Sequence, residues 1–306
     1  MRGFKFGVVL CSAMIGVGVV GTGSALGKLY KDYYDEEVLI EELLDIEAMN
    51  KVSIQADMPI RIEETTEQPK VIYKAQVQGI KDLKKEYAVE VETDGDKTVI
   101  EVDNDRQGIN FEWVQEEELV VFLPKKEMQE LIVEAEHAYS LDTFTYSGDN
   151  TIKEVDLTFG GEIKVELKGN YEDVAVEGRY GTLKMSTGTP TELELKGGIQ
   201  EVELKGAYKQ IDTTLESAEL KIFPTQPIES IYLEGYAGEV YMELPTGHKG
   251  FEVVKPYDAF EDNNQFYTNV DAAQSIIGET KESRTYGEQE TKIFVTYDST
   301  QVTIIE

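Results

Sequence analysis

Most of the chain alternates between apolar and polar residues with a period of two. From Val52 onward, apolar residues such as Ile60 and Ile62 or Val71 and Tyr73 flank single polar residues. In a β-strand, successive side chains point to opposite faces, so this pattern is typical of half-buried strands. We therefore predict an all-β body.

After Pro124 the alternation becomes a repeat, in which two apolar residues around one polar residue recur every 8 to 11 positions. The pairs include Val155/Leu157, Val174/Val176, Leu193/Leu195, Val202/Leu204 and Ile231/Leu233. Glycines stand at many of the junctions. This regularity favours a β-solenoid over residues 127–245, with two strands in each coil of about 19 residues. Residues 51–126 and 246–306 are then expected to form an N-terminal and a C-terminal β cap, the latter closing in a hairpin around Asp298–Thr300.

Residues 35–49 follow a helical period instead. Leu39, Leu43 and Ile46 recur at the i, i+4, i+7 spacing of one helix face, and Asp35 suits an N-cap. We predict a short acidic helix within residues 28–50.

The N-terminal residues 6–27 carry no charge. A helix of this length spans about 33 Å, enough to cross the hydrocarbon core of a bilayer. Arg2 and Lys5 precede it, which places residues 1–5 in the cytoplasm and the C-terminal bulk outside. We predict a retained transmembrane signal anchor in a single-pass protein of the bacterial cell membrane. The alternative is a cleaved signal peptide, with small residues at Gly23–Ala25 for the peptidase.

Charge narrows the expected partners. The chain has 306 residues and a net charge of −31, with 60 acidic and 29 basic residues. Such a charge repels nucleic acid and other phosphate-rich partners. The single cysteine, Cys11, lies in the apolar N-terminal run, so no intramolecular disulfide forms.

No sequence motif points to catalysis, a cofactor or a metal. His137 and His248 lie too far apart for a short-spacing zinc motif, and the chain has no GxSxG or P-loop pattern. Acidic pairs such as Asp94 and Asp96 match no complete calcium-binding loop. We expect no catalytic, cofactor-binding or metal residue and no enzymatic activity.

Tyrosines stand out at the glycine-containing junctions: Tyr171, Tyr180, Tyr208 and Tyr236. The last three are 28 residues apart, so in a stacked fold they could form an aromatic column. The column would either stabilise the body or offer a platform for sugar rings.

The arrangement of segments resembles the LiaG-like putative adhesin family of bacterial envelope proteins. The likeness rests on NKVSIQADMPIRI, on the strand–Leu–Pro elements VVFLPKKEM and VYMELPTG, and on the strand–glycine ladder between them. The resemblance implies a β-helix-like body outside the cytoplasm and a role in adhesion or envelope stress. It implies no catalytic residues.

These observations favour a non-enzymatic binding, adhesion or envelope-stress module. Besides the membrane itself, the expected partner is an envelope protein or a cell-wall glycan, and not nucleic acid. The alternatives are a polysaccharide-active enzyme, which would need acidic and basic residues converging in a groove, and a passive spacer.

Overall fold

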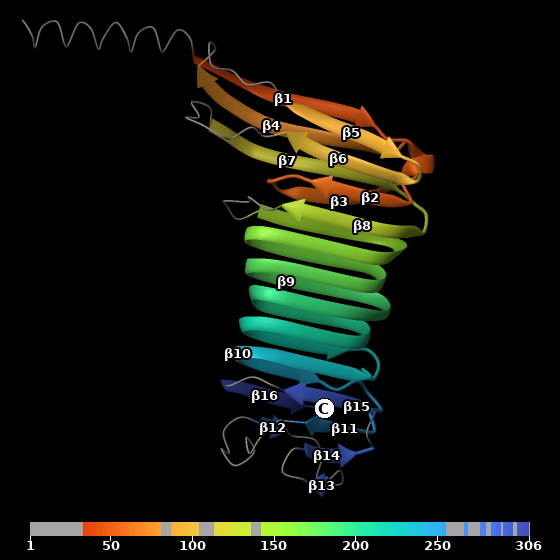
Figure 1. Cartoon of the computed structure of the whole chain (residues 1–306), viewed down its shortest axis with the longest axis vertical. Coiled ribbons are helices and arrows are strands. Elements are labelled where there is room, and N and C mark those ends of the chain that lie inside the picture. Colours follow the sequence, from red (N-terminus) through yellow and green to blue (C-terminus); the bar gives the residue numbers. More distant parts are fainter. Residues whose placement is uncertain are drawn as a thin grey trace, which may run out of the picture. The chain divides into compact units, whose positions relative to one another are not determined.

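The computed structural model describes residues 33–80, 87–103, 113–135, 142–254, 266–268, 276–279, 283–288, 290–295 and 299–305. In these residues the chain is all-β, and its strands join in one 16-stranded sheet (Figure 1). The strands are β1 (Tyr33–Leu43), β2 (Lys51–Gln55), β3 (Ile60–Thr65), β4 (Lys70–Ile80), β5 (Ala88–Asp94), β6 (Lys97–Asp103), β7 (Trp113–Pro124), β8 (Met128–Ala135), β9 (Asp142–Pro224), β10 (Ser230–Glu243), β11 (Gly250–Val254), β12 (Phe266–Thr268), β13 (Ile276–Glu279), β14 (Ser283–Gly287), β15 (Thr291–Val295) and β16 (Ser299–Ile305).

The chain divides into two compact units. The first contains Met1–Leu39, Lys74–Tyr87 and Asp105–Glu117, and the second contains Ile40–Tyr73, Ala88–Asn104 and Glu118–Glu306. Everything described below as the candidate site lies in the second unit.

The longest element, β9, runs for 83 residues and passes back and forth across the second unit (Figure 1). Parallel pairing sets its register: each residue of β10 from Ser230 to Gly235 lies beside the residue of β9 twenty positions earlier. Aliphatic side chains therefore line up from strand to strand. Ile231, for example, lies between Ile211 of β9 and Ile293 of β15, and all three are buried. Burial of these rows is the main stabilising contribution.

The predicted alternation places the core correctly. Val155, Leu157, Leu195 and Val202 are at most 2% exposed. Polar residues between them face outward, as expected for a sheet with one solvated face.

The all-β class is confirmed, but the architecture predicted with it is wrong. It combined a β-solenoid between two β caps with an N-terminal transmembrane helix and a juxtamembrane helix. In the described residues, strands assigned to the caps pair directly with the body: β2 pairs with β8, and β10 with β15 and β16. The result is one continuous sheet, and the pattern of short strands does not reveal these long-range pairings.

The predicted acidic helix is also wrong. Residues 33–43 form strand β1, whose neighbour in the sheet is β4, and the only described helical turn nearby is the 3₁₀ turn Ile46–Ala48. Asp35 caps no helix and accepts hydrogen bonds from Gln76 and Gln78 instead. A short helix with an unpaired acidic face is marginal alone, and strand pairing satisfies the same backbone groups.

The C-terminal hairpin is corrected as well. β15 and β16 do not pair with each other; both run parallel to β10, at Ser230–Leu233 and Ala237–Glu243. Each strand thus continues the parallel stack.

Within the described residues, no helix has the length and apolar character needed to cross a bilayer. The described residues therefore contain no segment that matches the predicted single-pass membrane localisation. The predicted anchor, residues 6–27, lies outside the described residues.

Candidate functional site

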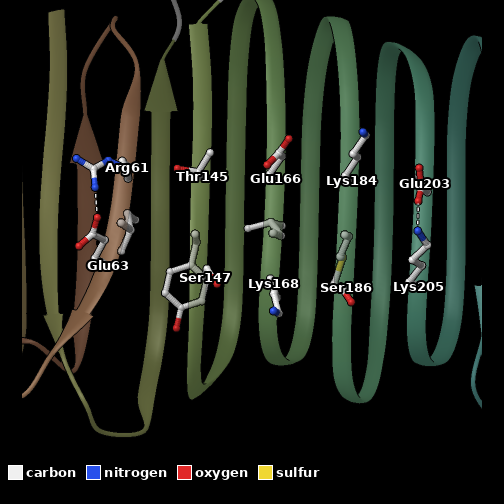
Figure 2. A pocket seen from close by; sticks show the side chains of 14 residues that line it. Arg61, Glu63, Thr145, Ser147, Glu166, Lys168, Lys184, Ser186, Glu203 and Lys205 are labelled. Atoms are coloured by element: carbon white, nitrogen blue, oxygen red, sulfur yellow. Dashed lines mark hydrogen bonds and ion pairs between the residues drawn. The ribbon is translucent and has the colours of Figure 1, made fainter.

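A groove of about 460 Å³ crosses the outer surface of the sheet in the second unit. One strand, β3, and four successive passes of β9 line it, as Figure 2 shows. We call this hollow the sheet groove. Its lining side chains come from Arg61, Glu63, Thr145, Ser147, Glu166, Lys168, Lys184, Ser186, Glu203 and Lys205.

Strand alternation explains why these ten side chains face outward. Each pair of lining residues flanks one residue whose side chain is buried in the core. These central residues are Ile62, Tyr146, Leu167 and Met185, each at most 2% exposed, and Leu204, fully buried. The sequence pattern that builds the core therefore also builds the groove, on the opposite side of the same strands.

The groove side chains form two parallel rows (Figure 2). The first row holds Arg61, Thr145, Glu166, Lys184 and Glu203, and the second holds Glu63, Ser147, Lys168, Ser186 and Lys205. Charged and hydroxyl groups alternate along the second row, whereas the first row has one hydroxyl group, on Thr145, among four charged residues. The arrangement offers hydrogen-bond donors and acceptors at regular intervals.

Ion pairs neutralise most of the charge in the groove. Arg61 donates to Glu118 over 2.8 Å and also pairs with Glu63, and Lys205 pairs with Glu203. Hydrogen bonding to Glu118 raises the pKa of Arg61, and hydrogen bonding from Lys205 lowers the pKa of Glu203. Glu203 therefore stays ionised at neutral pH.

Glu166 is paired from outside the groove, by Lys164 at 2.8 Å. Lys168 and Lys184 differ from the other charged groove residues, since neither forms an ion pair within 4 Å in the described part of the chain. Both are exposed. Two ammonium groups are thus available to a ligand.

A second hollow lies on other strands and is strongly acidic. Its lining comprises Lys51, Gln129, Glu130, Lys153, Glu154, Glu172, Asp173 and Glu192. Glu130 and Glu154 lie side by side in adjacent parallel strands. The described residues contain no group of three or more ligands that could hold a metal ion.

The predicted tyrosine column does not come together as one surface. Tyr171 and Tyr208 are fully buried, whereas Tyr180 is 57% exposed. The side chain of Tyr236 lies outside what the structure describes. Tyr171 instead packs on Tyr146, with 6.1 Å between the ring centroids.

His248 has a structural role. It is buried, its Nδ1 accepts a hydrogen bond from the backbone N–H of Gly250, and its Nε2 lies 3.2 Å from Oγ1 of Thr291. His137 lies outside the described residues. Asp94 and Asp96 flank the Gly95 turn between β5 and β6, where Asp96 accepts a hydrogen bond from Asn50.

Sequence reasoning missed the sheet groove because it depends on which distant residues become neighbours. The available signal was a polar residue on each side of a core residue, as in Glu166/Lys168, Lys184/Ser186 and Glu203/Lys205. These pairs recur 18 or 19 positions apart, close to the predicted repeat.

No protein-family model matches the chain, and no curated protein matches it. Similar solved structures include a "putative adhesin" from Bacteroides fragilis, at 10% identity and a TM-score of 0.38 over 88% of this chain and 97% of that one. A "putative adhesin" from Parabacteroides merdae has 10% identity and a TM-score of 0.37 over 89% and 97%. A "putative lipid binding protein" from Parabacteroides distasonis has 11% identity and a TM-score of 0.38 over 90% and 97%.

The names of these structures include adhesins, the class that the sequence resemblance implies. Likeness at this level assigns neither a family nor a function to the chain. Its LiaG-like character stays a prediction.

Proposed function

We propose that this protein is a non-enzymatic binding module that holds an extended partner from the cell envelope along the sheet groove. The observation that carries the proposal is the groove itself, with two rows of charged and hydroxyl side chains running across β3 and four passes of β9.

The form of the groove suits an extended ligand. Its lining comes from parallel strands, which lie about 4.8 Å apart, so the five labelled positions of one row cover roughly 20 Å. Because each strand is paired with its neighbours, the ligand does not have to order the backbone of the groove, which favours binding. Polar groups at regular intervals match a ligand with repeating units.

A polysaccharide-active enzyme is the competing interpretation, because Glu166 and Glu203 share the groove with lysines. Acid-catalysed sugar hydrolysis needs one carboxyl group that stays protonated, with a raised pKa, beside a second that is ionised. The pKa of Glu203 is lowered by its hydrogen bond from Lys205. Glu203 therefore does not supply the protonated carboxyl group that this reaction needs.

A pull-down with insoluble cell-wall material tests the proposal. The native chain should sediment with the wall material, and the Ser186→Trp variant, which fills the groove, should remain in the supernatant. Thr158→Trp is the matched control, since Thr158 is an exposed β9 position outside the groove. Equal sedimentation of the two variants would show that the sheet groove does not bind the wall material.

The same samples test for hydrolysis. Release of reducing ends from wall polysaccharide by the native chain, and its loss in Glu166→Gln or Glu203→Gln, would favour the enzyme instead.

A further inference from the structure

We infer that the ligand of the sheet groove is an acidic polysaccharide with a carboxylate on alternate sugars, and that Lys168 and Lys184 bind those carboxylates. The inference rests on the proposed function and names the chemical class of its ligand.

Local charge is the first argument. The groove is lined by four cationic residues and three carboxylates, in a chain that has 29 basic and 60 acidic residues. The carboxylates are already paired, by Arg61, Lys164 and Lys205. The charges left without an ion pair there, on Lys168 and Lys184, are both positive. An anionic ligand forms the strongest hydrogen bonds with these two ammonium groups, because donor and acceptor are then both charged.

The spacing of the lysines is the second argument. Lys168 and Lys184 lie on neighbouring passes of β9, in opposite rows of the groove (Figure 2). One strand spacing of about 4.8 Å and a two-residue step of about 6.6 Å along the strand place their backbone positions roughly 8 Å apart. A polysaccharide with one carboxylate on every second sugar repeats its charge at a comparable interval.

The remaining groove residues suit sugar hydroxyl groups. Thr145, Ser147 and Ser186 can donate or accept hydrogen bonds, and the ionised Glu203 can accept them. The aromatic residue of the lining, Tyr146, is only 1% exposed. The groove therefore offers no ring for stacking on a neutral sugar, and charge has to supply the specificity.

The net charge of the whole chain limits how anionic the ligand can be. A charge of −31 repels a polyanion at long range. A phosphodiester polymer with a charge on every unit meets this repulsion fully, whereas a glycan with sparse carboxylates meets less of it. Screening acts over about 8 Å at physiological salt, so short-range pairs in the groove persist.

Titration calorimetry with three probes tests the inference on the full chain. The probes are an oligosaccharide of alternating glucuronic acid and N-acetylglucosamine, the same oligosaccharide with its carboxyl groups reduced to alcohols, and short-chain inorganic polyphosphate. The native chain should bind the first and bind the other two at least about tenfold more weakly. Lys168→Gln/Lys184→Gln should weaken binding of the first probe by a similar factor.

The matched control is Lys196→Gln/Lys209→Gln, which removes the same charge from exposed lysines outside the groove. It should bind the acidic oligosaccharide as the native chain does. Equal binding of the acidic and reduced oligosaccharides, preference for polyphosphate, or full binding by the Lys168/Lys184 variant would each overturn the inference.

The ligand class and the proposed function can fail separately. If Ser186→Trp abolishes binding to wall material while the acidic oligosaccharide does not bind, only the ligand class is wrong. If neither wall material nor any probe binds, both are wrong.

Discussion

The hydroxyl group of Tyr146 donates a hydrogen bond of 2.9 Å to Oε1 of Glu64, a residue 82 positions earlier in the chain. The same carboxylate oxygen accepts the backbone N–H of Asn150 at 2.7 Å. The Glu64 side chain of β3 thus accepts hydrogen bonds from two residues in the first pass of β9. Tyr171, which packs on Tyr146, has a buried hydroxyl that finds no hydrogen-bond partner in the described part of the chain.

This contrast predicts opposite effects for two identical substitutions. Tyr146→Phe should lower the free energy of unfolding by about 1–3 kcal/mol, because it removes a bond to a charged acceptor. Tyr171→Phe should be neutral or stabilising, since it removes an unsatisfied buried polar atom. Urea denaturation of both variants measures the difference. Equal destabilisation would contradict the hydrogen-bond assignment.

Alkaline pH should destabilise the protein. Burial raises the pKa of Tyr146, Tyr171 and Tyr208 well above the ordinary value. These groups keep their protons when folded but lose them above about pH 10 when unfolded. The contribution of these tyrosines to the free energy of unfolding is therefore complete below about pH 10. It falls as pH rises further, by up to roughly 1.4 kcal/mol per pH unit for each tyrosine.

Urea titrations across this pH range measure the slope. Tyr171→Phe/Tyr208→Phe should make it shallower, and an unchanged slope would show that other groups cause the alkaline loss.

Asp156→Asn should raise the melting temperature at neutral pH. Burial, followed by repulsion from Glu130 and Glu194, raises the pKa of Asp156. The pKa of Asp156 in the folded state is raised above the unfolded value of about 3.9. The free energy of unfolding is therefore undiminished by Asp156 below about pH 4, and it decreases as pH rises through the folded pKa. The gain in melting temperature should vanish at about pH 3.5, where Asp156 is largely protonated in both the folded and the unfolded state. Asp149→Asn, at an exposed position, is the control and should change little.

Gly206→Ala should be among the most damaging single-methyl changes. Gly206 has φ +112°, and an added Cβ would lie 1.9 Å from the carbonyl oxygen of Thr187 in the neighbouring pass. Gly247 also has a positive φ, +84°, but a Cβ added there would meet no atom within 4 Å. We expect Gly247→Ala to cost about 1 kcal/mol and Gly206→Ala roughly 3 kcal/mol or more. Thermal denaturation should rank them in this order.

Leu195→Asp should prevent folding, because it places an unpaired carboxylate at a fully buried position. The adjacent Lys196→Asp changes an exposed residue and should leave the fold intact. Circular dichroism and size-exclusion chromatography distinguish the two outcomes. A folded, monomeric Leu195→Asp variant would show that this side chain does not face the core.

Alternation of residue types was enough to predict an all-β chain and which side chains enter its core. Val202 and Leu204 face inward and Glu203 and Lys205 outward, as the period of two requires. The same approach failed at β1, because the spacing of Leu39 and Leu43 also fits a helix. Only pairing with another strand decides between the two, and both leucines are largely exposed in the strand.

The sheet groove was beyond sequence reasoning for a different reason. Its ion pair between Arg61 and Glu118 joins residues 57 positions apart, and Arg61 lies beside Thr145 only because β3 pairs with β9. Register between distant strands depends on the whole stack. The interval of 28 residues between tyrosines has the same limit, since Tyr180 is exposed and Tyr208 is buried.

The twenty-residue step between β9 and β10 also bears on how the protein acquires its structure. Where partners are so near in sequence, closing the loop between them takes little entropy, and contacts of this kind form quickly. During synthesis, each new pass of the nascent chain can therefore pair with the pass that precedes it. Strands β2 and β3 differ, since their partners in β8 and β9 arrive roughly 80 residues later. We expect the middle of the chain to become protected from proteases before these first strands do.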